Sequence, residues 1–352
     1  MWLFCHPVPM GTETPRVAVV IPNWNCVEDL QDCVASLRAQ VGVELEIMVV
    51  DNGSTDRSIA WMREERIPHI PLPRNLGFAP AVNLGFSATT ADAVATVNAD
   101  TVLEPGALRE MHDVLMSDGH IGGVQPRILS LVRGRDRVPE DPSVLIYSLG
   151  QALTADGRAR EDGIGLPQGE RGFEAREIFG VCGAACMFRR QMVIDLGGYD
   201  ESYFAFYEDV DLNVRARIHG WTFRLVPAAV TWHVGNAAWN SGFDRPDAEN
   251  ARLVARNRIF TQAKFLPLRA LPRVSLVEVG AIFRAIAARR LMLTMAGKGA
   301  ALLRFPEMVK TRRRLRKEGR LELAQAWLGE SHRPPAEVLK HPLPPVGTPP
   351  RA

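Results

Sequence analysis

The sequence predicts an α/β fold, with a mostly parallel sheet flanked by helices and a helical C-terminal extension. Three observations support it. Short apolar runs alternate with amphipathic segments in the first half of the chain, polar residues follow the ends of those runs, and the later part is helical in pattern and basic. With 352 residues, of which 46% are hydrophobic, the chain can form one large domain plus an extension.

The strands of the first half are predicted at three apolar runs, residues 17–21, 46–50 and 93–97, which are typical of strands buried on both faces. A helix should follow the first run, with Asn25 as its N-cap. Further helices are expected at 54–66, at 76–88 and from Glu104 onward. This alternation favours a parallel sheet, on which ligands bind at the carboxyl ends of the strands.

The middle of the chain is less regular. Residues 133–172 are rich in Gly, Pro and charge, which predicts loops with a short hairpin around 148–158. A helix is expected over 212–219, ended by Gly220. Two short strands are predicted after it, at 222–227 and 229–233.

Four regions follow from these shifts in composition. They are an N-terminal extension at 1–15, a catalytic-type α/β domain at 16–240, a helical basic extension at 241–330 and a Pro-rich tail at 331–352. The tail holds seven prolines in 22 residues, which predicts disorder.

The helical extension has two features with open interpretations. Residues 274–295 are apolar but carry interspersed charges, and residues 310–320 hold seven basic side chains in eleven. Contact with a membrane surface is one interpretation. A packed helical subdomain with a solvated basic face is the other. Nucleic-acid binding is disfavoured, because the basic run lacks interleaved aromatic residues.

The five cysteines indicate a reducing compartment, because their number is odd and the chain is too large to need a disulfide scaffold. A structural role for Cys182 and Cys186 is favoured over a zinc site. Residues 1–15 do not resemble a signal peptide, and no apolar run reaches the roughly 18 residues of a membrane span. We therefore expect a cytoplasmic protein, with peripheral contact at the inner face of the cell membrane as a hypothesis.

Carboxylates follow two of the predicted strands, in Asp51-Asn52 and Asn98-Ala99-Asp100. Both should face one crevice at the edge of the sheet. A divalent cation bound to a diphosphate is held by one or two carboxylates, and Asp100 is placed to be one, with help from Asn98. The alternative is that Asp100 only caps a turn.

Three carboxylates in four residues, Glu208, Asp209 and Asp211, open a later helix. One could be a general base for an attacking hydroxyl. Acidic residues are also common in first helical turns, because a helix N-terminus favours anions. His233, at the end of a predicted strand, could be a metal ligand or a core histidine.

The segment Arg74-Asn75-Leu76-Gly77-Phe78 precedes a predicted helix. Gly77 permits a tight turn, and Arg74 or exposed backbone amides could contact a base or a phosphate. An ordinary connection between a loop and a helix is the alternative.

Taken in order, these segments resemble the family 2 glycosyltransferases of the GT-A fold, which has a Rossmann-like sheet. The resemblance runs from about residue 17 to about residue 235. It depends on five motifs in the expected order, which are Val19-Val20-Ile21-Pro22-Asn23-Trp24-Asn25, Val49-Val50-Asp51-Asn52-Gly53-Ser54-Thr55-Asp56, Arg74-Asn75-Leu76-Gly77-Phe78, Asn98-Ala99-Asp100 and Phe206-Tyr207-Glu208-Asp209-Val210-Asp211-Leu212.

The resemblance implies a site for a nucleotide diphosphate sugar. Asp51 matches the position that contacts the nucleotide base, and Pro22 and Asn25 lie in the loop that borders the nucleotide. Asp100 matches the metal-binding end of the Asp-x-Asp motif, for Mg²⁺ or Mn²⁺, and His233 matches a late histidine that joins this site in some members. The expected donor-binding residues are Pro22, Asn25, Asp51, Asn52, Arg74, Asn75, Gly77 and Asn98.

The acceptor side is implied in the same way. Asp209 matches the catalytic base of the Glu-Asp motif, with Glu208 beside it near the acceptor, and Gly183 and Ala184 match the acceptor floor. The implied reaction is an inverting single displacement, in which an acceptor hydroxyl attacks the anomeric carbon opposite the diphosphate.

One position departs from the family pattern, because Asn98 stands where the stricter motif has Asp. The Asn-x-Asp form is similar to the bacterial rhamnosyltransferase-like branch, which implies a rhamnose-type donor and a glycan or lipid-linked glycan acceptor. A non-catalytic sugar-nucleotide-binding scaffold of the same fold is one alternative. A nucleotidyltransferase is another, but residues 17–25 lack the Gly and Lys of its phosphate loop.

Overall fold

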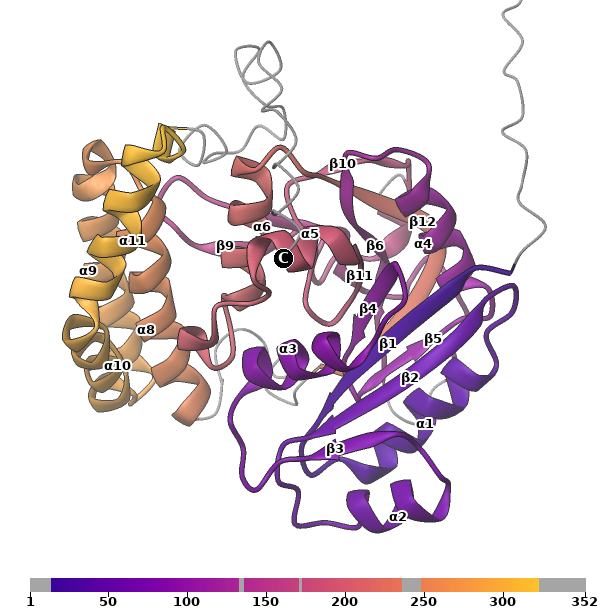
Figure 1. The fold of residues 1–352 in the computed structure, drawn as a ribbon. Helices are drawn as coiled ribbons and strands as arrows, with labels where there is room; N and C mark the ends of the chain where they lie inside the picture. Colours follow the sequence, from indigo (N-terminus) through magenta and orange to yellow (C-terminus); the bar gives the residue numbers. More distant parts are fainter. Residues whose placement is uncertain (1–13, 133–135, 171–172, 236–247, 323–352) are drawn as a thin grey trace, which may run out of the picture.

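The computed structural model describes residues 14–132, 136–170, 173–235 and 248–322 (Figure 1). The predictions for the Pro-rich tail and for most of the N-terminal extension fall outside the described residues.

The elements alternate as predicted through the first half of the chain. The strands are β1 (Arg16–Asn23), β2 (Glu44–Asp51), β3 (His69–Pro71), β4 (Ala93–Val97), β5 (Thr101–Leu103), β6 (Ile121–Ser130), β7 (Ile146–Ser148), β8 (Gln151–Leu153), β9 (Ala159–Glu161), β10 (Arg176–Ile178), β11 (Ala185–Arg189) and β12 (Thr222–His233). The helices are α1 (Val27–Arg38), α2 (Ser58–Glu64), α3 (Phe78–Ala88), α4 (Ala107–Met116), α5 (Arg190–Leu196), α6 (Glu208–Ile218), α8 (Ala248–Phe265), α9 (Leu271–Ala287), α10 (Leu291–Leu303) and α11 (Phe305–Lys317).

The described strands form one ten-stranded sheet and a separate pair, β8 and β9. The main path of the sheet is β10-β12-β6-β11-β4-β1-β2-β3, in which β1 to β4 pair in parallel. β11 runs antiparallel between β4 and β6, so its first residues lie where β4 ends. The predicted α/β fold is confirmed, and β11 brings the segment before residue 185 to the carboxyl edge of the parallel strands.

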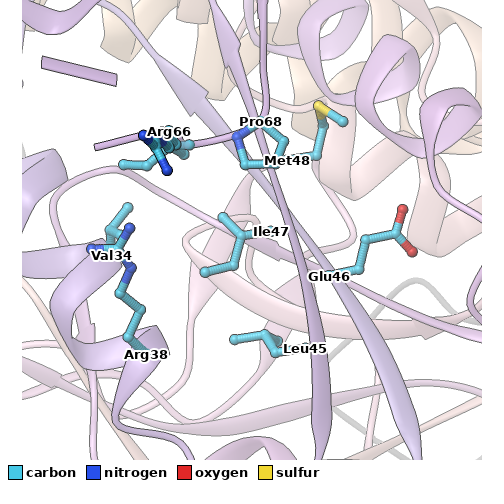
Figure 2. Close-up of a pocket in the computed structure, with 9 residues that line it drawn as sticks. Val34, Arg38, Leu45, Glu46, Ile47, Met48, Arg66 and Pro68 are labelled. Atoms are coloured by element: carbon cyan, nitrogen blue, oxygen red, sulfur yellow. The ribbon is translucent and has the colours of Figure 1, made fainter. Parts of the chain in front are cut away.

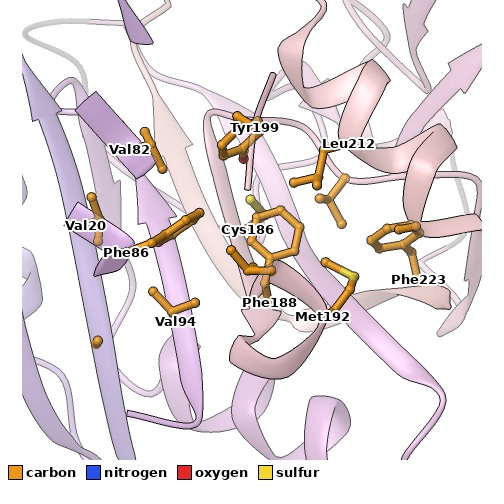
Figure 3. Close-up of a cluster of buried hydrophobic side chains, with 14 of the residues drawn as sticks. Val20, Val82, Phe86, Val94, Cys186, Phe188, Met192, Tyr199, Leu212 and Phe223 are labelled. Atoms are coloured by element: carbon orange, nitrogen blue, oxygen red, sulfur yellow. The ribbon is translucent and has the colours of Figure 1, made fainter. Parts of the chain in front are cut away.

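Helices cover both faces of the sheet, because the central strands are apolar on both sides. One core lies under α1, α2 and α4 and includes Leu30, Met62 and Leu108. The other lies under α3, α5 and α6, where Val82, Met192 and Leu212 pack against the sheet (Figure 3). The sheet is therefore packed on both faces, and the loops at its carboxyl edge project from it.

Two local predictions are wrong. The N-cap of α1 is Cys26 rather than Asn25, because the Asn25 Oδ1 accepts from the Thr55 N–H at 2.7 Å and a carboxylate oxygen of Asp56 accepts from the Val27 N–H at 3.1 Å. Residues 222–233 form one strand, β12, instead of two. It pairs with β6 on both sides of an irregularity between Val226 and Val230, so the break is a bulge.

The C-terminal helices pack against the α/β part through α8. Lys264 of α8 is buried and donates to Asp211 of α6 at 2.8 Å and to Asp200 at 2.6 Å. Leu315 of α11 joins a core cluster with Val210 and Val214 of α6. Figure 1 shows α8 to α11 side by side at the end of the molecule away from β3. Among the described residues, no helix combines the length and the apolar character needed to cross a membrane.

Candidate active site

The first half of the site lies at the ends of β1 and β2. The Asp51 carboxylate is buried and accepts hydrogen bonds from the Asn23 Nδ2 at 2.8 Å, the Ser54 N–H at 2.9 Å and the Ser54 hydroxyl at 2.6 Å. These bonds fix the turn after β2. The predicted contact of Asp51 with a nucleotide base stays a prediction.

Asn52 connects this turn by hydrogen bonds to a second loop, the one that contains Leu76 and Gly77. Its Nδ2 donates to the Gly77 carbonyl at 3.0 Å, and its Oδ1 accepts from the Leu76 N–H at 3.2 Å. Gly77 has a φ of 102°, and a Cβ there would lie 2.6 Å from the Phe204 carbonyl oxygen. Only glycine fits this close crossing of two backbones. Asn75 supports the same turn by accepting from the Gly77 N–H at 2.9 Å.

The second half of the site contains the predicted metal ligands. The Asp100 Oδ1 lies 3.0 Å from the His233 Nε2, and the Asn98 Nδ2 lies 3.3 Å from the same nitrogen. His233 reaches this place because β12 pairs antiparallel with β5, which sets His233 opposite Thr101. The ring of Tyr147 packs edge-on against His233, with centroids 4.4 Å apart.

These residues fit a divalent cation. The Asn98 Oδ1 and the His233 Nδ1 are buried and lack a hydrogen-bond partner among the described residues. The His233 Nε2 also faces both an acceptor and an amide nitrogen, a set that no single tautomer satisfies. A carboxylate oxygen, an imidazole nitrogen and an amide oxygen are suitable donors for Mn²⁺, and Mg²⁺ uses the oxygens.

The carboxylate of Asp209 lies on the other side of the site, at the start of α6. Its Oδ2 accepts from the Gly183 N–H at 3.1 Å and from the Gln151 Nε2 at 2.9 Å, while its Oδ1 accepts from the Val210 N–H at 2.7 Å. The Ala184 carbonyl accepts from the Asn98 N–H at 2.9 Å. The segment 183–184 therefore joins the Asp209 side to the Asp100 side.

A second carboxylate, Glu161, was not anticipated from the sequence. Gln151 and Glu161 are directly opposite each other in the β8–β9 pair, and the Gln151 Nε2 donates to the Glu161 Oε1 at 3.1 Å as well as to Asp209. Glu161, Cys182 and Asp209 each place one potential ligand atom within 4.8 Å of the others. Two carboxylates thus share one amide donor.

This shared arrangement changes the acidity of both groups. Burial raises the pKa of Asp209, although its hydrogen bonds from Gly183 and Gln151 oppose the rise. Burial and the neighbouring charge of Asp209 raise the pKa of Glu161 to about 7. The pair therefore takes up its first proton near neutral pH.

Glu208 differs from its neighbour Asp209. Its side chain is buried, and its Oε2 has no hydrogen-bond partner among the described residues. Burial, together with the neighbouring charge of Asp209, raises the pKa of Glu208 well above its ordinary value. The two members of the predicted catalytic pair thus differ in their hydrogen bonding, since the Asp209 carboxylate accepts three hydrogen bonds.

The loop before α6 has an unusual backbone that α8 supports. Phe204, Phe206 and Tyr207 all have φ near +70°, a left-handed conformation that bulky side chains rarely adopt. The Asn257 Nδ2 of α8 donates to the carbonyls of Tyr203, Ala205 and Phe206 at 2.9, 2.7 and 2.7 Å. This amide holds the loop that aims Asp209.

The remaining predicted residues lie nearer the rim. Pro22 is inside β1, and Asn25 and Arg74 are exposed. Asn25 contacts the Asp51 turn through Thr55. A pocket shown in Figure 2 lies elsewhere, beside β2 and α1, and its lining of Val34, Arg38, Leu45, Glu46, Ile47, Met48, Arg66, Ile67 and Pro68 contains no predicted site residue.

Comparisons with known proteins show relatives among the glycosyltransferases. A pre-mycofactocin glycosyltransferase of Mycobacterium tuberculosis is 32% identical over 65% of this chain and 45% of its own length. An N-acetylglucosaminyl-diphospho-decaprenol L-rhamnosyltransferase of the same organism is 27% identical over 62% of this chain and 76% of its own length. The chain spans less than half the length of the first curated relatives that it matches.

A solved structure, GalNAc-T7 with UDP, GalNAc and Mn²⁺, superposes with a TM-score of 0.53 over 72% of this chain and 51% of that one, at 16% identity. This likeness shows the fold. The model of the family described as glycosyl transferase family 2 matches residues 18–197. The chain therefore belongs to glycosyl transferase family 2 and has the GT-A fold.

Proposed function

We propose that this protein transfers a sugar from a nucleotide diphosphate donor to a hydroxyl group of a glycan or lipid-linked glycan, with inversion at the anomeric carbon. The observation that carries the proposal is the position of Asp209. Three hydrogen bonds orient its carboxylate, and the segment 183–184 links it to the Asp100–His233 group. In this proposal the base and the diphosphate site lie on either side of the segment 183–184.

In the proposed reaction, the acceptor hydroxyl gives its proton to the Asp209 carboxylate. Its oxygen forms a bond to the anomeric carbon as the bond to the diphosphate oxygen breaks, and the nucleoside diphosphate leaves. Gln151 and Gly183 hold Asp209 in one rotamer. Asp100, His233 and Asn98 would hold Mg²⁺ or Mn²⁺, whose charge would stabilise the leaving diphosphate.

A rhamnose-type donor is favoured within this proposal. The Asn98-Ala99-Asp100 form supports it, and so does the similarity to the mycobacterial L-rhamnosyltransferase. Asp51, Asn52, Asn75 and Gly77 would shape the nucleotide side, since their hydrogen bonds fix the two loops there.

A thermal-shift screen tests the donor and the metal together. Deoxythymidine diphosphate rhamnose and other sugar nucleotides should raise Tm in the presence of Mn²⁺ or Mg²⁺. Ligand at roughly 100 times Kd stabilises a folded protein by about 2.7 kcal/mol. Asp100→Asn should lose the metal-dependent part of the shift, whereas Asp32→Asn, on the exposed face of α1, should keep it. Equal shifts in both variants would rule out Asp100 as a ligand.

The pKa of Glu161 gives a prediction about stability. Because this pKa is about 7 in the folded protein against an ordinary value of 4.5, the folded state keeps a proton that the unfolded chain releases. Stability from this group is present below about pH 4.5 and is lost as the pH rises towards 7. Glu161→Gln has no such loss, so its stability relative to the wild type should increase from pH 5 to pH 8.

Urea unfolding at several pH values measures this difference. Glu110→Gln, which replaces an exposed carboxylate on α4, is the matched control and should show a difference that does not change with pH. A parallel pH dependence for the two variants would mean that Glu161 titrates normally.

A further inference from the structure

The solvent-exposed face of α9 is apolar, whereas a helix at a protein surface usually presents polar side chains to water. Leu276, Phe283 and Ile286 are 74%, 67% and 51% exposed, and Val279 is exposed with them. Their spacing of three and four residues places all four on one stripe of the helix. A contiguous exposed stripe of large apolar side chains marks an interaction surface.

The inner face of α9 combines ion pairs with apolar residues that are mostly only partly buried, among them Val277 and Ile282. Within this helix only Ala285 is buried. Glu278 pairs with Arg258 of α8, with an Nε to Oε1 distance of 2.7 Å, and with Lys298 of α10. The helix is therefore fixed to its neighbours by ion pairs in an orientation that leaves its apolar stripe in solvent.

The exposed charges on α9 and at its two ends all have one sign, although Arg273 also lies 3.9 Å from the buried carboxylate of Asp156. Arg273 and Arg284 are eleven positions apart, or about three helical turns, so they flank the same side of it. Arg269 and Arg289 lie near the two ends of the helix, and all four arginines are exposed. The only carboxylate in residues 268–291 is Glu278, which faces inward. The surface thus has an apolar centre and a cationic border.

We propose that this face of α9 binds an anionic lipid surface, with the helix lying in the interfacial plane. Apolar side chains at the centre would enter the boundary of the acyl chains, and the arginines would contact lipid headgroups. A second copy of the chain fits less well, because a symmetric contact would bring the arginine borders together. The inference is independent of the proposed catalytic function, since it uses none of the site residues.

Flotation of the full chain with vesicles tests the inference. Vesicles of phosphatidylcholine with phosphatidylglycerol should carry the protein upward, and vesicles of phosphatidylcholine alone should carry much less. The double variant Leu276→Gln/Phe283→Gln should reduce binding more than about tenfold, because two large apolar groups no longer leave water. Arg273→Gln and Arg284→Gln should each reduce binding to the anionic vesicles by about fivefold.

Controls separate lipid binding from folding and from self-association. Val41→Gln removes an exposed apolar side chain from the turn before β2 and should bind as the wild type does. Unchanged Tm in every variant shows that the fold is intact. Wild-type protein that fails to float with anionic vesicles, or a double variant that floats equally well, would overturn the inference. A dimer in solution that the double variant abolishes would assign the face to a second copy instead.

Discussion

Asp209→Asn is expected to lower kcat roughly 10²–10⁴-fold, which is the usual contribution of a general base. The amide keeps the size of the carboxylate but cannot accept the hydroxyl proton. Because Asp209 lies across the site from the Asp100–His233 group, the affinity for the donor should change little. Transfer assays at saturating donor, together with donor thermal shifts, measure the two effects separately.

The neighbouring carboxyl supplies a matched control. Burial raises the pKa of Glu208 well above its ordinary value, and Glu208→Gln keeps the shape of this side chain while it removes the titrating group. Its kcat should stay within about tenfold of the wild type, which is less than the loss of a general base. If Glu208→Gln lost as much turnover as Asp209→Asn, or if Asp209→Asn kept a normal rate, the assignment of the base would be wrong.

Lys264→Met is expected to destabilise the folded protein by about 3–5 kcal/mol, because removal of one partner leaves a buried ion pair uncompensated. Burial alone would lower the pKa of the Lys264 ammonium, but Asp211 and Asp200 raise it well above its ordinary value. Arg215 also contacts Asp211, at 2.6 Å, and would offset a part of the loss.

Unfolding in urea measures this effect, and Lys310→Met on the exposed side of α11 is the control for the loss of a positive charge. A change below about 1 kcal/mol, the level of a surface pair, would show that Lys264 contributes no more than an exposed lysine. If Lys264→Met lost donor binding without losing stability, the structural role proposed for Lys264 would likewise be contradicted.

The sequence allowed the positions of Asp51 and Asn98 at one edge of the sheet to be predicted, because local signals place them. Asp51 and Asn98 follow apolar runs, and parallel strands carry their ends to one edge. His233 was harder, since its contact with Asp100 depends on the pairing of β12 with β5. A prediction of two strands in place of β12 still put His233 at a strand end, and so the error did not move it.

The surroundings of Asp209 could be predicted only in part. Gln151 and Glu161 lie in a segment whose composition indicates loops, and a hairpin there says nothing about what it packs against. The bond from Gln151 to Asp209 joins positions far apart in sequence, and only the tertiary fold sets it. A hydrogen-bond donor that two distant carboxylates share produces no periodic pattern in the sequence, so it cannot be predicted from the sequence.

Asn257 has a consequence for how this protein can be divided. The family match ends at residue 197, yet the amide that secures the left-handed loop before α6 comes from α8. Grafting the terminal helices of another family member onto this sheet would therefore disturb the orientation of Asp209, the proposed base. A chimaera that exchanges α8 to α11 in order to change membrane binding should therefore keep Asn257, because loss of its amide would also alter the proposed active site.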